Sequence, residues 1–218
     1  MRRWFRARAL GGILGPAAFT AAWIVSTARQ QGYSIRDEHI SGLAAPDARN
    51  PGVMMAGFFA LGAGTIAAGS ALEDALGGWE RAGWGPRLIQ ASGLAALAAG
   101  VLRRDRMLLK PPEGAEHQQS WKNDGHDLAA GVVYVCLVAA PIALAVRWQD
   151  DPLWRHLARP ALAGAAVTLA SLALFASRVS EPGNGIVQRV MVTLPAAGLA
   201  SLSVELLRRP VVRAATGQ

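Results

Sequence analysis

The residues that could do chemistry in this chain stand close to the ends of long apolar stretches. His126 comes where such a stretch begins, and a histidine at a membrane boundary can act as a general acid or base because its pKa lies near neutrality. Asp105 precedes the same stretch and could orient the imidazole, and Asp37 offers another carboxyl group after an earlier stretch. We therefore take Asp105, His126 and Asp37 as the candidate catalytic residues.

Arg189 lies slightly inside an apolar stretch near the C-terminus. An ionisable group within a membrane is costly and usually has a function, so this arginine could hold an anionic group of a substrate. Tyr33 and Ser34 belong to a polar segment that we expect at the same membrane surface, and with Arg189 they are the candidate substrate-binding residues. Ser34 and Ser41 could also be nucleophiles, but no nucleophile-elbow pattern surrounds either serine, which favours turn or capping roles.

A purely structural interpretation of these groups is also open. Asp124 or Asp127 could cap a helix that starts here, because a side-chain carboxylate satisfies the free N–H groups of the first turn. In that case His126 and Arg189 would simply lie at the water interface.

Neither a metal nor a cofactor is expected. Asp37, Glu38 and His39 could bind a metal in principle. The four histidines, however, are scattered without a His-x-x-x-His spacing, and no two of them fall in the middles of apolar stretches, where a bis-histidine haem would need them. The single cysteine, Cys136, excludes an intrachain disulfide and any Cys-x-x-Cys site.

The elements that must position these groups are transmembrane helices. Hydrophobic residues make up 52% of the 218 residues and charged residues only 17%, whereas a soluble domain usually carries about 25% charged residues. The apolar residues come in unbroken blocks, and a block of roughly 18 or more can cross the hydrocarbon core as a helix. The net charge of +7 does not indicate nucleic-acid binding, because the arginines lie at the ends of the blocks, where topology and anionic lipids explain them.

The blocks predict an all-α, polytopic membrane protein with about six transmembrane helices in a single domain, residues 1–218. Both termini then lie on one side of the membrane, and the arginines ahead of the first span place that side in the cytoplasm. The first block is about 20 residues long and has no clear cleavage site, so we expect an uncleaved helix and not a signal peptide. The predicted spans are about residues 9–28, 51–72, 87–102, 126–146, 161–177 and 186–207.

Prolines, small residues and tryptophans predict details of the bundle. Pro51 and Pro160 stand where a helix can begin, and other prolines fall inside spans. Gly11 and Gly15 have a G-x-x-x-G spacing that lets helix backbones approach closely. Tryptophans near span ends predict an interfacial belt, namely Trp4, Trp79, Trp84, Trp121, Trp148 and Trp154.

Short motifs are spread over residues 10–205, namely Gly15-Pro16, Gly32-Tyr33-Ser34, Ile40-Ser41-x-Leu43, Met54-x-x-Gly57-Phe58, Gly125-His126 and Gln188-Arg189. Together they resemble a family of small six-helix bacterial membrane proteins, the domain of unknown function 998 family. Members of that family tend to carry Phe-Pro-x-Asp after the third helix, where this chain has Leu102-Arg103-Arg104-Asp105 and so departs in the local loop. The resemblance implies the fold and topology, and it brings no established activity.

Acid, base and hydroxyl groups therefore gather at one predicted membrane surface, above an apolar bundle. One hypothesis is a membrane-embedded enzyme that uses acid–base chemistry on a lipid or isoprenoid, as a terpene cyclase does. An apolar cavity raises the pKa of a carboxyl group and so preserves an acid for protonating an alkene or epoxide. Few aromatic side chains lie in mid-span to stabilise a carbocation, which counts against a cyclase.

The alternative hypothesis is a non-catalytic protein with a role in membrane binding or transport, or as an accessory subunit. Under both hypotheses the expected partners are membrane lipids or a lipid-like or isoprenoid small molecule. The expected location is the cell membrane, which the resemblance to bacterial proteins makes the inner membrane. The sequence does not indicate an oligomeric state.

Overall fold

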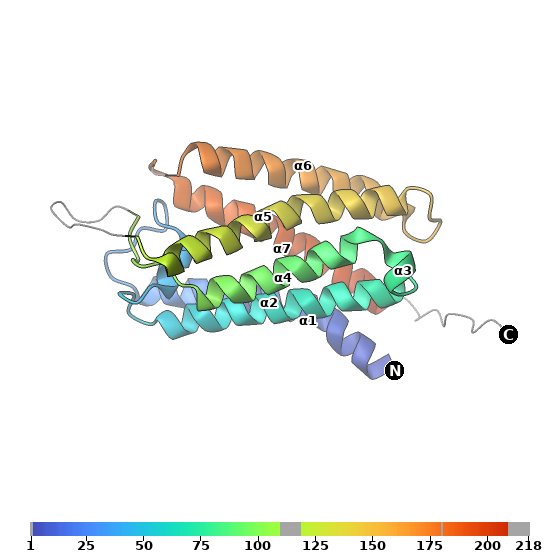
Figure 1. Ribbon diagram of the computed structural model, residues 1–218, viewed down its shortest axis with the longest axis horizontal. Coiled ribbons are helices and arrows are strands. Elements are labelled where there is room, and N and C mark those ends of the chain that lie inside the picture. Colours follow the sequence, from blue (N-terminus) through green and yellow to red (C-terminus); the bar gives the residue numbers. More distant parts are fainter. Residues whose placement is uncertain (1, 110–118, 180, 209–218) are drawn as a thin grey trace.

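The computed structural model describes residues 2–109, 119–179 and 181–208, and these residues form helices without any strand (Figure 1). Each predicted span is one helix, which confirms the all-α prediction. A short helix, α3 Trp79–Ala82, and a 3-10 helix, η1 Ile40–Ala44, were not predicted. The six long helices are α1 Arg2–Arg29, α2 Pro51–Ala75, α4 Trp84–Val101, α5 Trp121–Trp148, α6 Arg155–Ser177 and α7 Asn184–Arg208.

Five of the long helices, α1, α2, α5, α6 and α7, are long and apolar enough to cross a membrane. The chain is therefore a multi-pass α-helical membrane protein. The remaining helix, α4, falls short because its first two turns contain Pro86, Arg87 and Gln90. It still packs between α2 and α5, and Gln90 donates a 2.9 Å hydrogen bond to Glu73 of α2.

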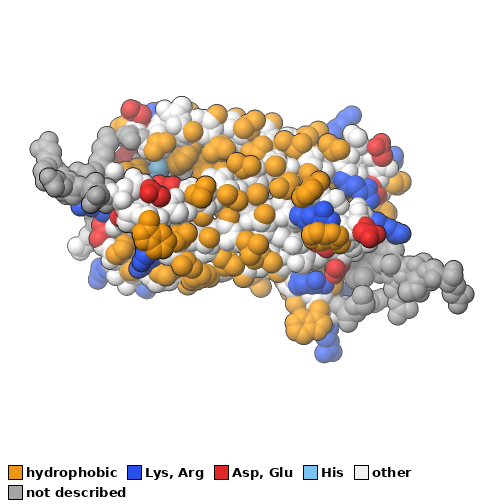
Figure 2. All heavy atoms as spheres, viewed as in Figure 1, with side chains coloured by type: hydrophobic (Ala, Val, Ile, Leu, Met, Phe, Trp, Pro, Cys, Tyr) orange, Lys and Arg blue, Asp and Glu red, His pale blue; other side chains and the backbone are white. Residues whose placement is uncertain are grey.

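On the face that Figure 2 shows, apolar side chains are spread along the length of the bundle, and charged side chains gather towards its two ends. On α5, for example, Leu128, Val135 and Val146 are more than half exposed. A surface of this kind fits the hydrocarbon of a bilayer. The start of α1 and the end of α7 lie at the same end of the bundle, as an even number of long helices requires (Figure 1). A cytoplasmic location of that end stays a prediction.

The opposite end is formed by the longer connections, residues 30–50, 102–109, 119–120, 178–179 and 181–183, and we call it the loop end (Figure 1). One of its helix starts differs from the prediction. The first residue of α5 is Trp121, ahead of the predicted residue 126, because the Ser120 side chain accepts a hydrogen bond from the Asn123 N–H. Ser120 is therefore the N-cap, in place of Asp124 or Asp127.

Prolines are placed partly as predicted. Pro51 is the first residue of α2, where its missing N–H costs nothing. Pro160 lies inside α6 and not at its start, because a turn from Asp151 to Trp154 already begins the helix at Arg155. Within the described residues, prolines also lie inside α1, α5 and α7, at Pro16, Pro141 and Pro195.

The contact between α1 and α2 depends on glycine. A Cβ atom placed on Gly15 would lie 2.6 Å from the carbonyl oxygen of Ala60, which is closer than real side chains allow. Gly62 of α2 and Gly93 of α4 meet in the same way, since a Cβ on either would lie 2.7 Å from the carbonyl oxygen of the other. The predicted Gly11–Gly15 face therefore does pack backbone against backbone.

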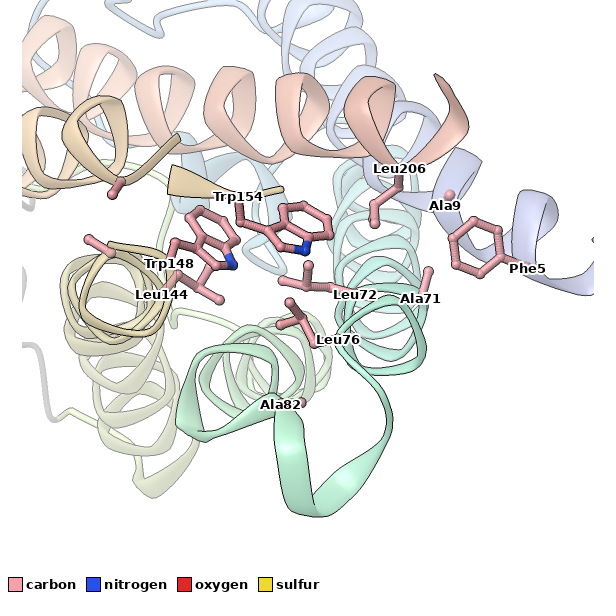
Figure 3. Packing of buried hydrophobic residues seen from close by; sticks show 12 residues of the cluster. Phe5, Ala9, Ala71, Leu72, Leu76, Ala82, Leu144, Trp148, Trp154 and Leu206 are labelled. Carbon is pink, nitrogen blue, oxygen red and sulfur yellow. The ribbon is translucent and has the colours of Figure 1, made fainter. Parts of the chain in front are cut away.

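Two tryptophans close the bundle at the end opposite the loop end (Figure 3). Trp148 and Trp154 stack with ring centroids 5.4 Å apart and pack with Leu72 and Leu206 in one buried cluster. Both rings are 3% exposed, so these two do not belong to the predicted interfacial belt. The other predicted belt residues are more than 60% exposed, namely Trp4, Trp79, Trp84 and Trp121.

Candidate functional site

A cavity of about 300 Å³, which we call the rim cavity, lies at the loop end. Its walls come from all the long helices except α4, together with η1 and the loop after α4. Its polar lining consists of His39, Ser41, Arg104, His126, Asp127, Tyr134 and Gln188. Its apolar lining includes three aromatic rings, Phe19, Phe58 and Phe175. This mixture of groups is typical of a ligand site, where a few polar groups orient a mostly apolar molecule.

His126 is held in one tautomer by the backbone of α4. Its Nδ1 lies 2.9 Å from the carbonyl oxygen of Ala99 and 2.7 Å from that of Leu102. Because a carbonyl oxygen can only accept, Nδ1 must carry the proton, and the neutral ring keeps its lone pair on Nε2. The edge of the ring also contacts Phe58. His126 thus lines the rim cavity with Nε2 as its hydrogen-bond acceptor.

Arg104 and His39 form a second polar unit of the rim cavity. The Nη1 of Arg104 lies 3.2 Å from Nδ1 of His39, and an arginine can only donate, so Nδ1 is the acceptor. The other ring nitrogen lies 3.3 Å from the side-chain amide of Asn184. Burial, together with the charges of Arg104 and Arg189, lowers the pKa of His39 to about 4. At neutral pH this ring is therefore an uncharged acceptor for Arg104.

Asp37 and Ser34, two of the sequence candidates, tie the loop after α1 to the start of α7. The Ser34 hydroxyl donates to the Asp37 carboxylate at 2.7 Å, and the Gly183 N–H donates to the same carboxylate at 2.8 Å. The hydrogen bond from Ser34, followed by that from Gly183, lowers the pKa of Asp37. Asp37 is therefore a charged anchor between two connections, outside the lining of the rim cavity.

Arg189 and Tyr33 are the other substrate-binding candidates, and both form hydrogen bonds within the loop after α1. Arg189 is buried, and its Nη1 donates to the carbonyl oxygens of Ile35, Glu38 and Gly185 at 2.8–3.0 Å. Its Nη2 donates to the Tyr33 hydroxyl at 2.6 Å. Burial raises the pKa of Tyr33, although the nearby guanidinium opposes this. Both Nη atoms of Arg189 thus donate to neighbouring oxygens of the protein, and the binding of a substrate anion by Arg189 stays a prediction.

Asp105 stabilises the start of α5. Its carboxylate accepts hydrogen bonds from both the N–H and the hydroxyl of Ser120, and its own N–H donates to the Asn123 side chain. Asn123 in turn donates to Asp127 at 3.0 Å. The backbone of α4, and not the Asp105 carboxylate expected from the sequence, orients the His126 ring.

Of the six residues predicted as catalytic or substrate-binding, only His126 lines the rim cavity, and Ser41, which was considered as a nucleophile, lines it as well. The residues that sequence reasoning left out of the site are Arg104, Asp127, Tyr134 and Gln188, with His39 considered there for metal binding only. One signal could have found part of this set. Asp127, Gly131 and Tyr134 have the i, i+4, i+7 spacing of a single helix face, and all three line the cavity. No comparable spacing connects Arg104 or Gln188 to that face.

An apolar cavity of about 790 Å³ continues from the rim cavity into the bundle between α2, α4, α5, α6 and α7. Phe19 and Val192 line both cavities, so the two adjoin. At the far end the apolar cavity reaches Trp148 and Arg208. The prolines inside α5, α6 and α7 all line it, namely Pro141, Pro160 and Pro195.

In the part of the chain that the structure describes, no three metal-binding side chains come together. Asp37, Glu38 and His39, adjacent in sequence, are engaged with different partners, since Glu38 accepts from the Leu109 N–H. The polar lining of the rim cavity supplies hydrogen-bonding groups, the charge of Arg104 and the carboxylate of Asp127.

Comparison with known proteins identifies a family. A family model described as "Protein of unknown function (DUF998)" matches residues 13–205 and thus reaches from α1 to α7. No curated protein and no solved structure matches the chain at a significant level. Because the family match covers most of the chain, the protein belongs to the DUF998 family.

Proposed function

We propose that this protein binds a lipid or isoprenoid in a cell membrane, with the polar end of the ligand in the rim cavity and its hydrocarbon chain in the apolar cavity. The observation that carries the proposal is that the two cavities adjoin at Phe19 and Val192. One ligand can therefore contact polar side chains at the loop end and apolar side chains deeper in the bundle. An amphipathic molecule fits this division, because burying a polar group against the apolar walls is costly.

The position of α6 supports entry of such a ligand from the bilayer. α6 packs mainly against α5 and α7, and its residues form one wall of the apolar cavity, among them Ala161, Gly164 and Thr168. It is also the least buried of the candidate spans. A displacement of α6 would therefore open the apolar cavity to lipid at a smaller cost than a displacement of α1 or α2.

A second candidate function is acid–base catalysis on the bound lipid, and His126 favours it. Nε2 is the acceptor of this ring, and a general base must lie within hydrogen-bond reach of the proton that it removes. Asp127 lines the same cavity and could take part in a proton transfer. Asp37 and Asp105 enter this proposal only as positioning residues, because N–H and O–H donors stabilise their charged forms. Protonation of an alkene, as in a cyclase, therefore receives less support than proton removal.

The binding proposal can be tested by identifying the lipids that accompany the purified protein. We expect mass spectrometry of the extracted lipids to find one lipid or isoprenoid class enriched over the bulk membrane. Gly198→Leu is the blocking variant, because a Cβ at Gly198 meets no atom within 4 Å and the position lines the apolar cavity. Gly52→Leu is the matched control, since Gly52 has the same open space but lines neither cavity.

The expected result is that Gly198→Leu loses the enriched lipid while Gly52→Leu keeps it. Equal enrichment in both variants, or bulk membrane composition in the wild-type protein, would contradict the binding proposal. The catalytic candidate is then tested with the enriched lipid itself. His126→Ala should abolish its conversion while leaving its enrichment intact, and unchanged conversion would remove His126 from the mechanism.

A further inference from the structure

Arg104 is the cation of the rim cavity, and within the described residues no ion pair joins it to a carboxylate. Among the described residues, its one hydrogen-bond contact is the neutral ring of His39, and its buried Nε has no hydrogen-bond partner among them. A guanidinium carries five N–H donors. Most of its donor capacity is therefore not used by the described residues around it. The Nε of Arg189 also lacks a partner, but both Nη atoms of Arg189 are engaged, in four hydrogen bonds.

The described residues around Arg104 fix its position without neutralising its charge. His39 accepts from Nη1, and its ring lies between Asn184 of α7 and the ring of Phe175 on α6, whose centroid lies 4.9 Å away. An uncharged acceptor orients a guanidinium as a carboxylate would, but it leaves the positive charge available. The charge therefore stays available at the cavity wall, in partly buried surroundings where it acts more strongly than in water.

We infer that Arg104 binds a terminal phosphate on the polar end of the ligand, an inference that rests on the proposed lipid-binding function. The fork of a guanidinium matches two phosphate oxygens. A tetrahedral phosphate has further oxygens to satisfy, and Ser41, Tyr134 and Gln188 place hydroxyl and amide groups on the wall of the same cavity. These groups together suit a phosphate monoester better than a neutral alcohol.

Asp127 brings the opposite charge to the same cavity and limits what can bind. Asp127 is exposed, and its carboxylate already accepts a hydrogen bond from the Asn123 side chain. Water screens an exposed charge more strongly than a partly buried one, so the attraction to Arg104 dominates for a group bound beside it.

The inference is tested with farnesyl phosphate and farnesol, which share a hydrocarbon chain and differ in charge. Binding is measured by microscale thermophoresis on the full chain in maltoside micelles, which contain no phosphate. We expect wild-type protein to bind farnesyl phosphate at least about tenfold more tightly than farnesol. Arg104→Gln should lose this preference and keep its affinity for farnesol, so farnesol binding also reports that the variant is folded.

Two controls separate the alternatives. Arg36→Gln removes an exposed arginine of the loop end that does not line the cavity, and it should keep the preference. Inorganic phosphate alone should bind at least about a hundredfold more weakly than farnesyl phosphate, because it gains nothing from the apolar cavity.

The outcomes distinguish the two proposals. Equal affinity of wild-type protein for farnesyl phosphate and farnesol, or an unchanged preference in Arg104→Gln, would overturn the role of Arg104 and leave lipid binding intact. Failure of both farnesyl compounds to bind, or inorganic phosphate binding as tightly as farnesyl phosphate, would overturn the lipid-binding function itself.

Discussion

Some glycines of α1, α2 and α4 lie against the backbone of a neighbouring helix, namely Gly15, Gly62, Gly64 and Gly93, whereas Gly131 of α5, Gly164 of α6 and Gly198 of α7 face open space. A Cβ on Gly62 or Gly93 would collide with a carbonyl oxygen. A Cβ on Gly131, Gly164 or Gly198 would meet no atom within 4 Å. All three of the latter positions line one of the two cavities.

The difference teaches that a glycine in a membrane helix has two uses in this chain. Between α1, α2 and α4 it brings backbones together, because lipid supplies no hydrophobic drive for helix association. Around the cavities a glycine has no side chain to fill the space, so it leaves the cavity volume larger. The first group of helices is then a rigid support, and the second forms walls of the two cavities.

The largest expected effect comes from filling a contact on the rigid side. Gly64→Leu places a side chain against the backbone of Gly11 and Gly15 in α1, which forces the two helices apart. We expect a loss of about 4 kcal/mol or more in the free energy of unfolding, measured in micelles with a chemical denaturant. A loss below about 1 kcal/mol would show that the α1–α2 contact is not rigid.

Arg189→Met should have the next largest effect, because it cuts the link between α7 and the loop after α1. The variant leaves the carbonyl oxygens of Ile35, Glu38 and Gly185 without their donor. We expect a loss of about 3 kcal/mol in the free energy of unfolding. Tyr33→Phe, which removes a single hydroxyl from the same network, is the control and should lose about 1 kcal/mol.

Acid should weaken the cavity side of the bundle through His39. Its pKa of about 4 in the folded protein lies below the ordinary 6.5, so the unfolded chain binds the proton more readily. Stability is therefore complete above about pH 6.5 and falls as the pH drops towards 4, by about 2–3 kcal/mol. His39→Gln should lose this component of the pH dependence, and an identical pH profile in the variant would contradict it.

Hydrogen exchange locates the same effect in the structure. Because the His39 ring contacts Phe175 of α6 and Asn184 of α7, acid should lower the protection of amides, relative to their intrinsic exchange rate at the same pH, in α6 and α7 before α2. An equal loss of amide protection in α2 would contradict the distinction between the two sides of the bundle.

The smallest effect on stability is expected for Gly164→Leu. The leucine enters open space at the apolar cavity, and leucine also has the better helix propensity. We expect the free energy of unfolding to change by less than about 1 kcal/mol, against the loss of about 4 kcal/mol or more in Gly64→Leu. A large destabilisation of Gly164→Leu would show that the cavity wall is as closely packed as the α1–α2 contact.

The bundle could be predicted from the sequence because membrane helices must satisfy their own backbone hydrogen bonds and must be long and apolar. The positions of α1, α2, α5, α6 and α7 follow from that constraint, whereas α4 was predicted from the apolar part of a helix whose first turns are polar. The helix starts were less accurate, since a local capping contact such as that of Ser120 extends α5 beyond its apolar part. The burial of Trp148 and Trp154 also escaped prediction, because it requires α5 and the turn before α6 to meet in space.

The candidate site could be predicted only in part. His126 was found because its residue type and boundary position indicate acid–base chemistry. Arg189 has the more conspicuous position, yet three carbonyl oxygens engage it, and no sequence pattern indicates which carbonyls a loop will turn inward. Arg104 lies in an arginine-rich loop where nothing but tertiary packing against His39 distinguishes it from Arg103 or Arg106.

The prolines along the apolar cavity have a mechanical consequence. Pro141, Pro160 and Pro195 have no N–H, so the carbonyl groups of Leu137, His156 and Met191 lose their usual α-helical donors. A helix that lacks one of its backbone hydrogen bonds bends more easily than an intact helix. All three helices around the apolar cavity can therefore bend at these prolines. Under the proposed lipid binding, this would let them adjust their spacing to hydrocarbon chains of different length.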